Sequence, residues 1–175
     1  MQCLSSVEKA LQGISSEIIV VDNHSQDQSC DWGKQYFPKV RLLQQQENGG
    51  FSKGNNVGVK IANGKYICLL NPDTVVSETV FEKLLNFAES RNDLGAVGPQ
   101  LIDGTGDFLP ESKRNLPTPK VALQKLMKLE KNYYSSLKQE ETGKVAVLVG
   151  AFMLMKKELD VMVEMILDTR WYILI

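Results

Sequence analysis

Short, continuous apolar runs alternate with segments of helical periodicity in the N-terminal half of the chain, and this order restricts the fold more than any other feature. Strands are expected at 18–21, 40–43 and 66–70, each followed by a helix, at 29–36, 52–63 and 77–90. An unbroken β-branched run such as Ile18-Ile19-Val20-Val21 is typical of a strand covered on both faces of a parallel sheet. The alternation therefore predicts an α/β domain with a mainly parallel sheet flanked by helices.

The remaining segments follow these patterns less regularly. A helix is expected over 5–13, ending at Gly13, and a further strand begins at 94–97. Residues 120–137 are interpreted as a basic amphipathic helix or a partly ordered segment, and the apolar stretch 145–155 as a strand. A length of 175 residues suits a single domain, 1–175.

Charge and composition exclude several classes of function. A net charge of −1, from 20 basic and 21 acidic residues, gives no general attraction to nucleic acid or to an anionic membrane. The apolar runs are too short for a transmembrane helix, and no signal-peptide pattern is seen at Met1. Because Cys3, Cys30 and Cys68 have neither disulfide nor zinc spacing, we expect reduced thiols in a cytoplasmic protein.

Acidic and amide residues follow two of the expected strands. Asp22 and Asn23 come directly after the first strand, and Asp73 comes after the third, in the sequence Asn71-Pro72-Asp73. A polar residue after a buried strand is most often part of a turn or a helix cap. Ligands of open α/β sheets, however, bind beyond the carboxyl ends of the strands, so two acids on the same sheet edge indicate a binding site.

A loop rich in glycine and asparagine, ENGGFSKGNNVG at 47–58, lies between these two points at the start of an expected helix. Glycine allows close backbone approach, and helix N-termini favour anions, although an ordinary glycine-rich loop is the alternative. Its spacing is neither GxGxxG nor a P-loop, which argues against a dinucleotide site. A lone Asp73 with Asn71 beside it suits a magnesium-like cation that completes its shell with phosphate and water.

Four blocks of the sequence, in this order, resemble glycosyltransferase family 2, with the rhamnosyltransferase-like members most similar. They are EIIVVDNHSQD, ENGGFSKGNNVGVKIANGKYICLLNPDT, VGPQLIDGTGDFLPESKRNLPTP and VGAFMLMKKEL, within residues 17–159. The resemblance implies a GT-A fold, the α/β fold of nucleotide-diphospho-sugar transferases, with a metal-binding DxD motif.

The resemblance also implies roles for individual residues. Asn71-Pro72-Asp73 stands at the DxD position, with Asp73 as the metal ligand. The positions that match the nucleotide-sugar site are Asp22, Asn23, Asn48, Gly50, Asn55, Asn71 and Asp73. Gly150, Ala151 and Phe152 match a segment near the donor sugar and the acceptor, and Lys113 and Arg114 lie in a loop where basic residues could meet acceptor phosphate or simply be solvated.

Two departures from the family pattern lead to an expectation of an N- and C-terminally incomplete, truncated domain. The family's first strand, central in its sheet, has no counterpart before the helix that begins the chain. After Leu159 the family's Gly-Gly-Phe-Asp segment and acidic pair are replaced by residues 160–175, where Asp160, Glu164 and Asp168 do not fit the motif. The catalytic base is therefore unknown, and a frameshift, testable in the encoding DNA, is the hypothesis for this end.

The function expected from the resemblance is metal-dependent, inverting transfer of a sugar, with rhamnose as a candidate. The donor would be a UDP- or dTDP-sugar, the metal Mg or Mn, and the acceptor a saccharide or a polyprenyl-linked molecule. Nucleic acid is not expected as a partner. We expect a cytoplasmic protein, with peripheral association at the inner face of the plasma membrane and a homodimer as further expectations. The alternatives are an inactive fragment and a flavodoxin-like binding or signalling module.

Overall fold

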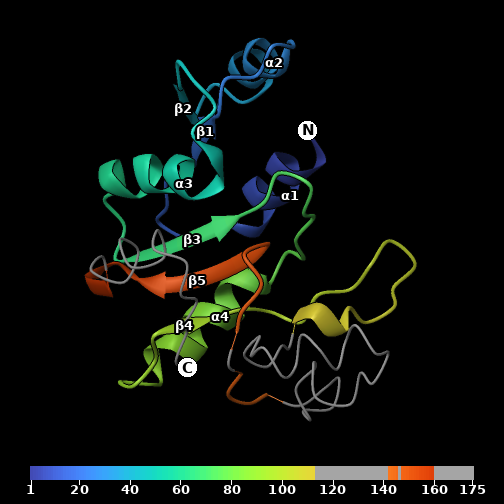
Figure 1. Ribbon diagram of the computed structural model, residues 1–175. Coiled ribbons are helices and arrows are strands. Elements are labelled where there is room, and N and C mark those ends of the chain that lie inside the picture. Colours follow the sequence, from blue (N-terminus) through green and yellow to red (C-terminus); the bar gives the residue numbers. More distant parts are fainter. Residues whose placement is uncertain (113–141, 146, 160–175) are drawn as a thin grey trace, which may run out of the picture. The chain divides into compact units, whose positions relative to one another are not determined.

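The computed structural model describes residues 1–112, 142–145 and 147–159 (Figure 1). The elements, in chain order, are α1 (Gln2–Ala10), β1 (Ile19–Asp22), α2 (Ser29–Tyr36), β2 (Arg41–Gln44), α3 (Gly50–Ile61), β3 (Tyr66–Leu70), α4 (Val80–Glu89), β4 (Ala96–Val97), a 3-10 turn at Pro110–Ser112, β5 (Phe152–Lys156) and a 3-10 turn at Lys157–Leu159. The residues pack as two compact units: 1–67, 72–82 and 156–159 form the first, and 68–71, 83–112 and 142–155 without 146 form the second. The predicted segment 120–137 lies outside the described residues.

The first unit contains a parallel strand pair with helices packed on it. β1 and β2 are parallel, with Ile19 opposite Arg41 and Asp22 opposite Gln44, and α2 connects them. α3 packs against β1. Gly58 makes this approach close, because a Cβ atom at that position would lie 3.1 Å from Cγ2 of Val21. The β-α-β order read from the sequence is therefore confirmed here, and it brings the loops after β1 and β2 to one edge.

α1 forms the other helix of the first unit and begins earlier than the sequence pattern predicts. Cys3, Val7 and Ala10 are buried at spacings of four and three residues, which gives the helix one apolar face. The hydroxyl of Ser6 accepts a hydrogen bond of 3.1 Å from the backbone N–H of Val76. This bond fastens the segment that carries Asp73 to α1.

The second unit contains the last residues of β3 together with β4 and β5. The strand order is β3-β5-β4, so β5 lies between two strands that precede it by many residues (Figure 1). β5 is antiparallel to β4, with Ala96 opposite Met155. Because β5 is central, its residues from Phe152 to Met155 are all buried, and the exposed fraction of Met153 is only 2%.

The sheet arrangement corrects one expectation from the sequence. Parallel pairing holds for β1 and β2, whereas β5 enters as an antiparallel strand from outside the regular strand–helix alternation. Among the described strands, β1 and β3 belong to different sheets. The expectation that Asp22 and Asp73 follow strands of one sheet is therefore wrong for these strands, although both residues lie in the first compact unit.

In the part of the chain that the structure describes, no helix has the length and apolar character needed to cross a bilayer.

Candidate nucleotide-binding site

The loop after β1 is organised by the carboxylate of Asp22. Its two oxygens accept hydrogen bonds of 3.3 and 3.2 Å from the backbone N–H of Ser25, and its exposed fraction is 9%. Burial raises the pKa of Asp22, but hydrogen bonds from Ser25 and from the thiol of Cys30 outweigh it, so the net pKa lies below the ordinary value of 3.8. Between Asp22 and Ser25 the backbone of His24 adopts φ 69°, a left-handed conformation that is uncommon outside glycine.

Because of this carboxylate, the free energy of unfolding should depend on pH in the acidic range. Since the pKa of Asp22 is depressed by folding, its contribution is present above the ordinary pKa and is lost as pH falls through the folded-state value. We expect the free energy of unfolding of the wild type to fall more steeply than that of Asp22→Asn below about pH 4. Urea denaturation from pH 7 to pH 3 measures this difference, and parallel pH profiles would contradict it.

Two amide side chains join the loop after β1 to the loop before α3. Nδ2 of Asn23 donates a hydrogen bond of 2.7 Å to Oδ1 of Asn48. Oδ1 of Asn23 accepts one of 3.0 Å from the N–H of Gly49, and Oδ1 of Asn48 accepts one of 3.0 Å from the N–H of Gly50. We call this group of four residues the amide clamp. It brings together three residues that the sequence assigned to one site: Asn23, Asn48 and Gly50.

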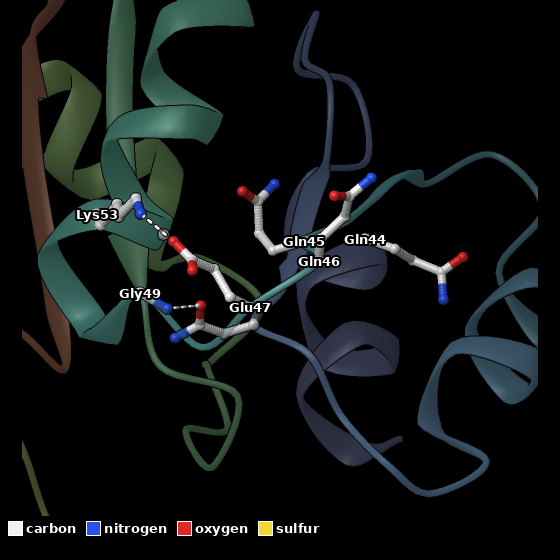
Figure 2. Close-up of a pocket in the computed structure, with 8 residues that line it drawn as sticks. Gln44, Gln45, Gln46, Glu47, Gly49 and Lys53 are labelled. Carbon is white, nitrogen blue, oxygen red and sulfur yellow. Dashed lines mark hydrogen bonds and ion pairs between the residues drawn. The ribbon is translucent and has the colours of Figure 1, made fainter.

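A polar pocket of about 520 Å³ opens beside the amide clamp (Figure 2). It is lined by residues of the loop after β1, the end of β2 and the first turns of α3: Asn23, Gln44, Gln45, Gln46, Glu47, Gly49, Lys53 and Gly54. Figure 2 shows the amide ends of Gln45 and Gln46 on the same side of the chain, while the side chain of Gln44 points away from them. The pocket therefore offers mainly amide donors and acceptors.

One ion pair crosses this pocket wall. Nζ of Lys53 lies 2.6 Å from Oε1 of Glu47 (Figure 2), and the two side chains are largely exposed. The hydrogen bond from Lys53 and its positive charge lower the pKa of Glu47. An exposed pair of this kind contributes little to stability, so Lys53 can be released to another anion at small cost.

Gln44, Gln45 and Gln46 were missed as site residues in the sequence, and Glu47 and Lys53 were included only as members of the loop 47–58. The run Gln44-Gln45-Gln46-Glu47 directly after an apolar strand was the available signal, because it continues the strand to the edge where ligands bind. Asn55, which was predicted for the site, is half-buried on α3 and does not line this pocket.

Asp73 lies in a different part of the first unit. It is exposed and lines a second pocket of about 300 Å³, with Pro72, Val75, Met1 and the first two residues of α1, Gln2 and Cys3. Among the described residues, no group of three or more His, Cys, Asp or Glu side chains could hold a metal ion. A single accessible carboxylate fits a hard cation that takes its other ligands from phosphate and water. It does not fit a metal site in which the protein supplies every ligand.

The residues predicted near the acceptor lie in the second unit. The N–H of Asn71 donates a hydrogen bond of 3.0 Å to the carbonyl oxygen of Ala151, which joins two predicted segments. The side chain of Phe152 has an exposed fraction of 3% and is part of the core, and Gly150 is half-buried. Other residues named from the sequence lie outside the described residues: Lys113, Arg114, Asp160, Glu164 and Asp168.

The mixed α/β arrangement of strands and helices defines the class of GT-A domains, and solved structures agree. GalNAc-T7 crystallised with UDP, GalNAc and Mn²⁺ superposes with a TM-score of 0.59 at 16% identity, over 89% of this chain and 32% of that one. At this identity the likeness establishes the fold alone, and the predicted GT-A fold is confirmed.

The family model described as glycosyl transferase family 2 matches residues 2–161, and the chain belongs to this family. The minor teichoic acid biosynthesis protein GgaB of Bacillus subtilis is 39% identical over 94 residues, 51% of this chain and 10% of GgaB. The poly(ribitol-phosphate) beta-N-acetylglucosaminyltransferase TarP of Staphylococcus aureus is 27% identical over 111 residues, 62% of this chain and 34% of TarP. The chain thus spans about a third or less of these two relatives. The family assignment replaces the flavodoxin-like alternative.

Proposed function

We propose that this chain is the donor-binding part of a glycosyltransferase that moves a sugar from a nucleoside-diphospho-sugar to a cell-wall polysaccharide. The observation that carries the proposal is the polar pocket beside the amide clamp, at the carboxyl ends of two parallel strands, in a chain of glycosyltransferase family 2. Ligands of open α/β folds occupy this position.

The chemistry of the pocket favours a nucleotide as its occupant. Carboxamides such as those of Gln45 and Gln46 offer donors and acceptors that match the edge of a base or the hydroxyls of a ribose. Lys53 and the N-terminal turn of α3 provide positive potential for a diphosphate. The pocket therefore suits a UDP- or dTDP-sugar better than an apolar ligand.

Asp73 is the residue proposed to hold a divalent cation, Mg²⁺ or Mn²⁺. Its exposed carboxylate lines the second pocket, and the structure of GalNAc-T7 named above was solved with Mn²⁺ and UDP. When bound, such a cation neutralises the negative charge of a leaving diphosphate. The contribution of this chain is to present one carboxylate, next to Pro72, whose ring fixes the backbone direction.

The acceptor proposed here is a cell-wall polymer, since GgaB and TarP carry names that refer to teichoic acid and to poly(ribitol-phosphate). We further propose that the transferred sugar is rhamnose and that its anomeric carbon is inverted. Both points rest on the resemblance to rhamnosyltransferase-like members. The general base that an inverting transfer needs within hydrogen-bond reach of the acceptor hydroxyl is left unassigned.

The proposal predicts selective binding of nucleoside diphosphates. We expect UDP or dTDP with Mn²⁺ to raise the unfolding temperature of the wild type, because a ligand that binds only the folded protein stabilises it by about 2.7 kcal/mol at roughly 100 times its Kd. Thermal denaturation and isothermal calorimetry measure the effect, with ribose 5-phosphate and Mn²⁺ alone as controls. Equal shifts with every anion, or none with any nucleotide, would rule out the proposed donor site.

A further inference from the structure

The hydrogen bonds of the amide clamp indicate a specific role for Asn23. This inference rests on the proposed function of the pocket as the donor site. We propose that Asn23 is a positioning residue: it acts through Asn48 and Gly49 to hold the wall of the pocket, and not by direct contact with the nucleotide. This differs from the role implied by the sequence resemblance, in which Asn23 itself faces the nucleotide.

The hydrogen bonds of Asn23 fix its carboxamide toward the protein. Its Nδ2 donates to Asn48 at 2.7 Å and its Oδ1 accepts from Gly49 at 3.0 Å, across 25 and 26 residues of sequence. Two bonds from opposite ends of one planar amide set the orientation of its plane. The N–H and the lone pair that make these two bonds are directed at the protein and are not offered to the nucleotide.

The residues held by the clamp are those with the greatest backbone freedom in the loop. Gly49 and Gly50 are consecutive glycines, and Gly50 adopts φ 80°, in the left-handed region. Exposed hydrogen bonds of this kind contribute little to the free energy of folding. Their larger effect is to order the loop before a ligand arrives, so that binding does not carry that entropic cost.

The set of residues that line the pocket supports an indirect role for Asn23. Asn23 and Gly49 line the pocket, whereas Asn48 does not line it and is hydrogen-bonded to Asn23. Removing Asn23 and removing Asn48 should therefore disturb the same loop in the same way. Two direct ligands would instead contribute independently.

The two asparagines also differ in hydrogen-bond chemistry, which gives a matched pair of variants. Asn48 acts in the clamp as an acceptor, so Asn48→Asp retains an oxygen for Asn23 and for Gly50. Asn23 acts as both donor and acceptor, so Asn23→Asp keeps the bond to Gly49 but faces Asn48 with a second acceptor. The same change from amide to acid should be tolerated at position 48 and harmful at position 23.

The test combines amide hydrogen exchange with a double-mutant cycle in the full chain. Without nucleotide, we expect faster exchange of the Gly49 amide in Asn23→Ala and of the Gly50 amide in Asn23→Asp, with both amides protected in Asn48→Asp. In UDP titrations with Mn²⁺, Asn23→Ala, Asn48→Ala and the double variant should each weaken binding by about the same factor, on the order of tenfold.

The possible results separate this inference from the proposed function. Additive losses in the double variant, on the order of a hundredfold, would identify Asn23 as a direct ligand and overturn the positioning role. Unchanged exchange at Gly49 in Asn23→Ala would also overturn it. If the wild type binds no UDP, the proposed donor site fails, while the exchange measurements still decide whether Asn23 orders the loop.

Discussion

Asp73→Ala is expected to remove the stabilisation that Mn²⁺ and UDP together give to the protein, while leaving the metal-free protein as stable as the wild type. The exposed carboxylate of Asp73 makes no hydrogen bond that holds the first unit together among those described, and the backbone bond from Val76 to Ser6 fastens its segment independently. Loss of the side chain should therefore affect ligand binding and not folding. A carboxylate that supplies one of the protein's few metal ligands should account for at least a tenfold change in affinity.

The matched control for this variant is Asp93→Ala. Asp93 is also an exposed aspartate, in the second unit, and its ion pair with Lys144 at 3.9 Å is too long and exposed to matter for stability. Calorimetric titration of UDP with and without Mn²⁺ should give wild-type values for Asp93→Ala. Metal-dependent UDP binding that is unchanged in Asp73→Ala would remove Asp73 from the proposed metal site.

Met153→Ala is expected to destabilise the protein more than any substitution discussed above. Met153, the second residue of β5, is the largest side chain in the described part of the chain with an exposed fraction as low as 2%. Truncating a buried methionine removes its apolar contacts and leaves a cavity, at a cost of about 2–5 kcal/mol. Urea denaturation followed by circular dichroism measures the change in the free energy of unfolding.

Ile102→Ala provides the comparison for this core variant. Ile102 is also a large aliphatic residue, but its exposed fraction is 57%. Its truncation should change the free energy of unfolding by roughly 0.5 kcal/mol or less. Equal losses in the two variants would show that β5 is not the core strand of its sheet.

The part of the fold that was predictable from the sequence is the part built from local patterns. The β-branched run ending at Asp22 and the helix that follows it obey the rules for a parallel β-α-β unit, and β1, α2 and β2 follow them. β5 was predictable as an apolar strand, but its position in the sheet was not, since the sequence does not indicate which strands a distant segment pairs with. Its insertion between β3 and β4 is a long-range pairing.

The candidate site divides in the same way. Asn23, Asn48 and Gly50 were named from residue type and resemblance, and the structure brings them into one hydrogen-bonded group. That Asn23 uses both ends of its amide within the protein could not be predicted, because it depends on the relative orientation of two loops. Phe152 was named for the acceptor region, but its burial reflects a central strand that the local sequence does not reveal.

The position of β5 also governs when each part of the protein can form during synthesis. The β1-α2-β2-α3 portion is complete by Ile61, so it can fold while the rest of the chain is still on the ribosome. β3 and β4 must wait, because the strand that separates them ends only at Lys156. During this interval their apolar residues remain uncovered, and nascent chains that pause before β5 emerges should be the species most dependent on chaperones.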